Sequence, residues 1–156
     1  MNESKTMVSK ELLRLWTIAN AEAWFCQASN IEPVHFWIAA LKLADPDIAG
    51  AMLENGAAPE ECEAQSQLSK QLLAYLEMTP EETAKFRRRE RAKILNGRAP
   101  RGMPEDGPPY LHRSESSRRL FQIALRKAES RKSSELTPMH RLESLFDMNL
   151  VSLPSS

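Results

Sequence analysis

The sequence has few of the residues that form disulfides, tight turns or aromatic clusters. It holds two cysteines and five glycines, aromatic residues make up 6% of it, and its 21 basic residues balance its 21 acidic ones. Neither cysteine has a second cysteine or a histidine at metal-ligand spacing, so we interpret Cys26 and Cys62 as small apolar residues of helices. Few glycines and few aromatic residues favour helices over a sheet sandwich.

Long apolar runs are also missing. No stretch approaches the ~20 apolar residues that a membrane-spanning helix needs, and the first ten residues are polar, unlike a signal peptide. We therefore expect a cytoplasmic protein without a membrane partner. The zero net charge argues against bulk nucleic-acid binding, which needs a basic surface overall.

The neutral total hides an asymmetry between the two halves of the chain. Residues 1–84 carry 5 Lys or Arg against 13 Asp or Glu, and residues 85–156 carry 16 against 8. We interpret this as attraction between the halves within one fold, and the alternative is that it orients the domain on a charged partner.

Catalytic and ligand-binding motifs are absent from the sequence. There is no G-x-x-x-x-G-K-S/T phosphate loop, no G-x-S-x-G elbow, no pair of Cys-x-x-Cys sets and no H-E-x-x-H helix. The three histidines are not spaced for a sequence-local metal site. We predict that the chain is not an enzyme and binds neither a metal nor a cofactor.

What the sequence does contain is an internal repeat. Segment 30–41 returns as segment 135–146, and the offset of 105 residues extends without gaps into the preceding segment. The pairs of similar residues at this offset are Leu15/Leu120, Trp16/Phe121, Ile18/Ile123, Ala19/Ala124, Ala23/Ala128, Ser29/Ser134, Ile31/Leu136, Pro33/Pro138, His35/His140 and Leu41/Phe146. We infer that a helix, a tight turn and a second helix were duplicated, and we interpret the paired histidines as structural residues of the turn.

Hydrophobic spacing and capping residues predict helices through most of the chain. The expected ranges are 10–27, 33–44, 46–53, 59–76 and 80–95, followed by helices beginning after Ser114 and Thr137. Between Arg98 and Pro109, four prolines and two glycines predict a linker without regular structure.

These elements predict an all-α fold, in which two pseudo-repeated helical units pack as one compact bundle and the second repeat is incomplete. We expect a single domain over 1–156. It divides into a first repeat at 10–78, a basic helix and Pro/Gly-rich linker at 79–112, a partial second repeat at 113–149 and a tail at 150–156.

The alanine-bearing helix, the capped turn and the histidine before an apolar helix resemble the Clp N-terminal repeat domain of the Clp/Hsp100 unfoldases, where the unit also occurs as a tandem pair. The resemblance covers residues 10–76 and 113–149. It implies a module that docks a substrate, peptide or adaptor protein for an ATP-dependent chaperone, protease or secretion-associated unfoldase, with a Clp/Hsp100 ATPase as a further partner. In that family the residue before the histidine is commonly a glutamate, which in some members recognises cationic or phosphoarginine ligands. Here this residue is Val34 in one copy and Met139 in the other. That ligand is therefore not implied here.

Aromatic residues beside the first helical stripe and in the second helix are the candidate docking residues. We predict that Trp24, Phe25 and Trp37 anchor a partner in a groove between helices, because aromatic side chains dominate such contacts.

The basic segment 85–101 carries the alternative, in which a helical scaffold contacts nucleic acid or phosphate. The candidate residues are Arg87, Arg88, Arg89 and Arg91. Nucleic acid is the less favoured partner, since Phe86 is the only aromatic residue there and single-strand binders need several. We favour packing of this helix against the acidic first half of the chain.

Overall fold

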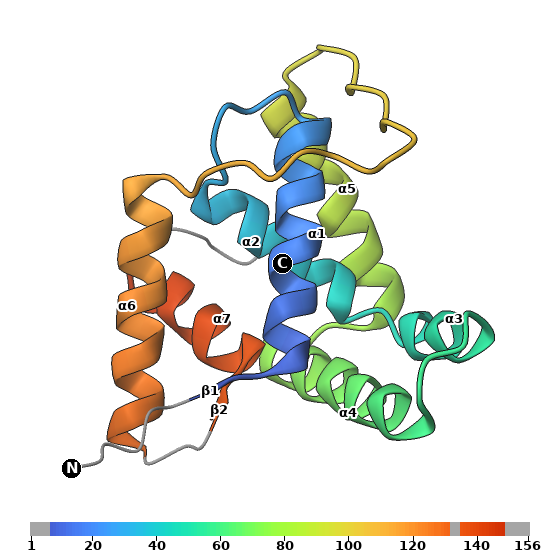
Figure 1. Ribbon diagram of the computed structural model, residues 1–156, viewed down its shortest axis with the longest axis vertical. Coiled ribbons are helices and arrows are strands. Elements are labelled where there is room, and N and C mark those ends of the chain that lie inside the picture. The colour runs from blue at the N-terminus through green and yellow to red at the C-terminus, as the bar shows by residue number, and fades with distance from the viewer. Residues whose placement is uncertain (1–6, 132–134, 149–156) are drawn as a thin grey trace.

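The structure, a computed structural model, describes residues 7–131 and 135–148. Within these residues the chain is mostly helical, with two short strands, which confirms the predicted all-α class (Figure 1). The elements are β1 (Met7–Val8), α1 (Lys10–Phe25), α2 (Pro33–Leu43), α3 (Asp47–Glu54), α4 (Pro59–Leu76), α5 (Pro80–Leu95), α6 (Glu115–Ser130), β2 (Glu135–Leu136) and α7 (Pro138–Asp147). The expected tail at 150–156 and Asn149 lie outside the described residues.

Local sequence signals explain where the helices begin and end. Proline occupies the first turn of α2, α4, α5 and α7, where its fixed φ suits the helix and its missing N–H needs no partner. Before α5, Thr79 and Glu82 form a reciprocal capping box, with hydrogen bonds of 3.1 and 2.8 Å. The helix ends at Leu95, and its C-cap Asn96 adopts the left-handed conformation with φ of 49°.

Helix α2 is the centre of the bundle. Helices α1, α4, α5, α6 and α7 all pack against it, and most of its side chains are buried. Buried polar groups of α4 hold this helix to the C-terminal end of α2. Ser69 Oγ and Gln65 Nε2 both donate to the carbonyl oxygen of Leu43, at 2.7 and 3.1 Å. Those bonds satisfy a carbonyl that a helix end leaves without a partner.

Helices α1 and α6 correspond closely. Both have 16 residues and begin 105 positions apart, each after a serine whose hydroxyl accepts a backbone N–H from the first turn. The buried stripe of α1 is Leu12, Leu15, Ala19 and Ala23, and at the same offset that of α6 is Ser117, Leu120, Ala124 and Ala128. The offset thus holds for bounds, caps and buried faces, while the duplication of an ancestral unit stays a prediction.

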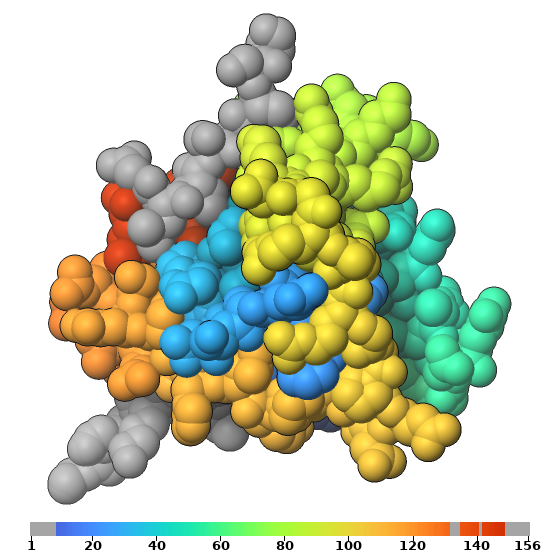
Figure 2. Space-filling model, turned by 90° about the horizontal axis from the view of Figure 1, so that it is seen from above, coloured from blue at the N-terminus to red at the C-terminus, as the bar shows by residue number. Residues whose placement is uncertain are grey.

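Two segments lie at the edge of this arrangement. The α3–α4 hairpin projects from the bundle on the side away from α6 (Figure 1). The linker between α5 and α6, which we call the strap (residues 98–112), has no helix, as predicted, and runs back along α1. Figure 2 shows it in yellow and amber, lying over the blue end of α1.

Candidate functional site

The three aromatic residues predicted as docking anchors do not form one surface. Trp37 has no exposed area and lies in the core, edge-on to Phe86 and Phe146 with ring centroids 5.9 and 5.5 Å away. Its prediction as an anchor is wrong, because α2 is enclosed by helices on all sides and Trp37 fills the space between α5 and α7. A side chain without accessible surface cannot contact a partner in this fold.

Trp24 and Phe25 lie near the last turn of α1 and are half-buried. The indole N–H of Trp24 donates to the carbonyl oxygen of Gly102 in the strap at 3.1 Å, and the guanidinium of Arg101 stacks over the indole ring at 4.0 Å. Arg91 lies 5.5 Å from the ring centroid of Phe25. These cation–π contacts cover apolar ring surface, so the two residues do not present an open patch.

The four arginines of the predicted basic contact fall into two pairs with different surroundings. Arg91 donates through two nitrogens to the carboxylate of Glu22, one bond being 2.9 Å, and the Glu22 side chain is only 4% exposed. Burial, with Arg91 beside it, lowers the pKa of the Arg87 guanidinium. Arg91 and Arg87 therefore belong to the packing of α5 on the acidic first half, as favoured from the sequence.

Arg88 and Arg89 point to the other side of α5. With Lys85 and Ala92, they line a hollow of about 520 Å³. Lys85 and Arg88 make no ion pair with any residue that the structure describes, whereas Arg89 lies over the ring of Phe86 at 5.9 Å. Of the four predicted arginines, Arg88 and Arg89 are therefore the two that remain available to a partner.

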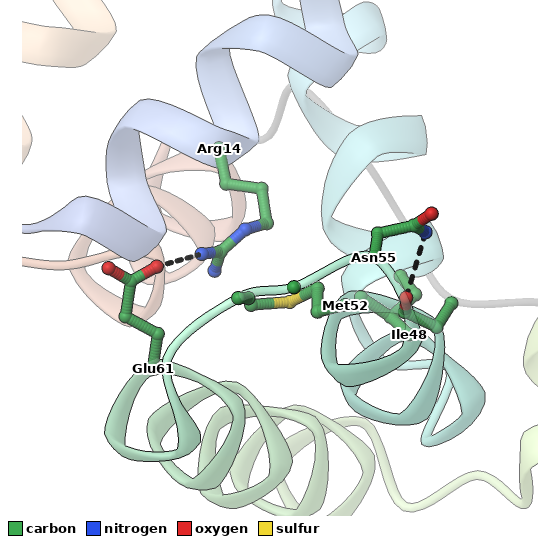
Figure 3. A pocket seen from close by; sticks show the side chains of 8 residues that line it. Arg14, Ile48, Met52, Asn55 and Glu61 are labelled. Atoms are coloured by element: carbon green, nitrogen blue, oxygen red, sulfur yellow. Dashed lines mark hydrogen bonds and ion pairs between the residues drawn. The ribbon is translucent and has the colours of Figure 1, made fainter.

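A second hollow, of about 460 Å³, separates α1 from the α3–α4 hairpin, and we call it the hairpin groove (Figure 3). Its lining residues are Arg14, Ile48, Ala51, Met52, Asn55, Gly56, Ala57 and Glu61. Its volume lies within the range of about 300–1,000 Å³ that is usual for ligand sites. Sequence analysis did not single out any of these residues.

Polar groups form one wall of the hairpin groove. Arg14 of α1 donates to Gln65 Oε1 at 2.9 Å and lies 3.9 Å from Glu61, which also pairs with Lys10 at 3.1 Å. Figure 3 shows Arg14 and Glu61 facing one another on one side of Met52, with Ile48 and Asn55 on the other side. The groove thus combines a charged edge with an apolar floor.

The apolar floor comes from α3, whose helical spacing places Ile48 and Met52 on one side of the helix. None of the eight residues of α3 is buried, and the helix packs mainly against α4. Ile48 and Met52 are half-buried in the groove. The short amphipathic pattern from Ile48 to Leu53 was the sequence signal that could have pointed to this groove. Whether the apolar side of that helix stays open depends on the distance between α1 and the hairpin, which the sequence does not show.

The two paired histidines cap helices. The Nδ1 atom of His35 accepts the backbone N–H of Glu32 at 2.8 Å, and Nδ1 of His140 accepts that of Thr137 at 3.0 Å. Burial lowers the pKa of His35 to about 4 and also lowers that of His140. Each neutral ring orients the turn before its helix, in agreement with the structural role expected for both.

Comparisons with protein-family models, with curated proteins and with solved structures find no match to this chain. Among the described residues, no group of three or more His, Cys, Asp or Glu side chains is placed to hold a metal ion. No helix in the described part is long and apolar enough to cross a membrane.

Proposed function

We infer that this chain is a protein-interaction module, resembling the N-terminal domain of the Clp/Hsp100 unfoldases, and that a partner docks in the hairpin groove. The partner would be a substrate, peptide or adaptor protein of an ATP-dependent chaperone, protease or secretion-associated unfoldase. The observation that carries the proposal is the hairpin groove itself, where Ile48 and Met52 of α3 line an open hollow and are only half-buried. Apolar surface of this kind is typical of docking sites for peptides and helices.

The arrangement of the helices also supports the resemblance. Helices α1 and α6, and α2 and α7, begin at the same offset, with a proline and a capping histidine in each member of the second pair. The sequence lacks a phosphate-binding loop, so the role that we propose is docking, without an ATP-driven or other catalytic step. We propose a cytoplasmic location, with which the two free cysteines agree.

Site-specific photo-crosslinking in the source cell tests the proposal. A photoreactive amino acid at Met52 faces the groove, whereas the same amino acid at Leu53, which is 54% exposed and outside the groove lining, is the matched control. We expect a defined adduct from position 52 and none from position 53, and mass spectrometry of the adduct names the partner. Equal adducts from both positions, or none from either, would contradict docking in this groove.

The basic face of α5 carries a second candidate function, contact with an anionic partner. Lys85 and Arg88 support this candidate, because neither forms an ion pair with a carboxylate in the part of the chain that the structure describes. An Arg88→Glu, Arg89→Glu variant should then lose binding to labelled single-stranded RNA, and the parent should bind RNA less at higher salt. Phe86 is 4% exposed and offers no ring for base stacking, which weakens the nucleic-acid form of this candidate.

A further inference from the structure

The charge around the hairpin groove is strongly one-sided. Residues 43–69, which include α3 and the first part of α4, contain six carboxylates and no lysine or arginine. Those carboxylates belong to Asp45, Asp47, Glu54, Glu60, Glu61 and Glu63. Clustered exposed carboxylates give the hairpin a negative potential, which favours an approaching cation and disfavours an anion.

The cations at the groove come from α1 and are both engaged. Arg14 is 21% exposed and is held by Gln65, so it belongs to the wall of the groove. Lys10 is 72% exposed and is held in the described chain by a single ion pair with Glu61. An exposed ion pair is weak, since water solvates both partners well when it opens. A cation from a partner can therefore replace Lys10 at Glu61 at little cost.

The floor of the groove sets the second requirement. Ile48, Ala51 and Met52 present apolar surface along α3, and the unbranched thioether of Met52 adapts to side chains of different shape. A purely polar cation, such as a polyamine, would leave this surface exposed to water. The groove therefore favours a ligand that brings an apolar group and a positive charge together.

We propose that the hairpin groove binds a segment of a partner protein in which a large apolar side chain lies next to lysine or arginine. The apolar side chain packs on Ile48 and Met52, and the cation pairs with Glu61 in place of Lys10. This inference rests on the proposed docking function and adds the chemistry of the partner. The same groove would exclude acidic segments, because the hairpin carboxylates repel them.

Two labelled peptides of equal length test the inference, one built from leucine and lysine and the other from leucine and glutamate. Fluorescence anisotropy measures their binding to the parent chain and to two variants. Ala51→Trp fills the groove without changing its charge, and Leu53→Trp places the same ring on α3 outside the groove lining. Circular dichroism checks that each variant keeps the helical content of the parent.

A second pair of variants isolates the charge. Glu61→Gln removes the carboxylate in the groove with little change in shape, and Glu63→Gln removes an exposed carboxylate on the same helix outside the lining. We expect the leucine–lysine peptide to bind the parent, the Leu53→Trp variant and the Glu63→Gln variant with similar affinity. Its binding should be lost in Ala51→Trp and weakened about twofold to fivefold in Glu61→Gln, as for one partly exposed charge pair.

Three results would overturn the inference. The first is a leucine–glutamate peptide that binds as tightly as the leucine–lysine peptide and is blocked by Ala51→Trp, which would leave docking in the groove intact but reject its charge preference. The second is equal weakening by Glu61→Gln and Glu63→Gln, which would mean a diffuse charge effect without a site. The third is no binding of the leucine–lysine peptide at all, and the crosslinking comparison of positions 52 and 53 then decides separately whether the groove docks anything.

Discussion

The backbone N–H of Ser114 donates to the carbonyl oxygen of Ile31 at 3.0 Å, and this bond ties the start of α6 to the start of α2. The equivalent bond runs from the N–H of Ser9 to the carbonyl oxygen of Leu136 at 3.0 Å and ties α1 to α7. Ser9 lies 105 residues before Ser114, and Leu136 lies 105 residues after Ile31. Helix α6 is therefore joined to the start of α2, and helix α1 to the start of α7. Neither the pair α1 and α2 nor the pair α6 and α7 completes these contacts alone, so the two pairs of helices fold as one bundle.

The two serines at these junctions should contribute similarly to stability. Each caps its helix through a hydroxyl that accepts a backbone N–H, at 3.0 Å for Ser9 and 3.2 Å for Ser114. We expect Ser9→Ala and Ser114→Ala each to lower the free energy of unfolding by about 1 kcal/mol, measured by urea denaturation. Ser130→Ala, at the exposed end of α6, is the control and should change it little. A large difference between the two caps would contradict the equivalence of the junctions.

Trp37 and Trp24 should differ sharply in their effect on folding. Trp37→Ala should lower the free energy of unfolding by about 3–5 kcal/mol, because it leaves a cavity between α5 and α7. Trp24→Ala removes a half-buried ring and should cost about 1 kcal/mol. Urea denaturation followed by circular dichroism measures both. Equal costs would show that Trp37 is not at the centre of the core.

The ion pair between Glu22 and Arg91 predicts an order among three variants. Arg91→Leu leaves a carboxylate that is 4% exposed without its partner and should cost about 3–5 kcal/mol. Glu22→Leu leaves Arg91, which is 24% exposed and partly solvated, and should cost less. The double variant should recover much of the loss, because an apolar pair replaces both charges. A double-mutant cycle on the unfolding free energies tests this order, and additive losses would contradict it.

The stability of the protein should fall in mild acid because of His35. Burial lowers its pKa to about 4, below the ordinary value, so the unfolded state binds the proton first as pH falls. The contribution of His35 to the free energy of unfolding is complete above the unfolded pKa and is lost progressively towards pH 4. The loss reaches roughly 2 kcal/mol near pH 5. Urea denaturation at a series of pH values measures the slope. His35→Asn, which keeps an acceptor for the N–H of Glu32, should have a smaller slope, and an unchanged slope would exclude His35 as the cause.

The strap should open more readily than the bundle. Asn20 holds it through two bonds, accepting the N–H of Leu111 at 2.8 Å and donating to the carbonyl of Pro109 at 3.1 Å. In Asn20→Ala, hydrogen exchange at the Leu111 amide should become about tenfold faster or more, while amides of α2 keep their protection. Mass spectrometry of exchange, resolved to short peptides, distinguishes this from general destabilisation, in which both regions would accelerate together.

Much of the helical structure could be predicted because its signals are local. Thr79 with Glu82, proline in the first turn before His35 and the left-handed Asn96 act within a few residues of one another, and the sequence alone shows them. The offset of 105 residues was visible for a different reason, because comparing a sequence with itself needs no tertiary structure. The candidate site could not be found in this way, since Arg14 meets Glu61 and Met52 only after α1 has packed beside the hairpin.

The sequence by itself determined which segments become helices, where each one begins, and that two pairs of helices share caps and buried stripes. Only the tertiary structure decided that Trp37 is enclosed while Trp24 lies under the strap. It also decided that Arg91 pairs with Glu22, while Arg88 has no ion pair with any described residue. The physical reason is distance along the chain. Caps and periodic stripes depend on neighbours within about two helical turns. Exposure and charge pairing depend on which distant helices come together, and Glu22 and Arg91 are 69 residues apart.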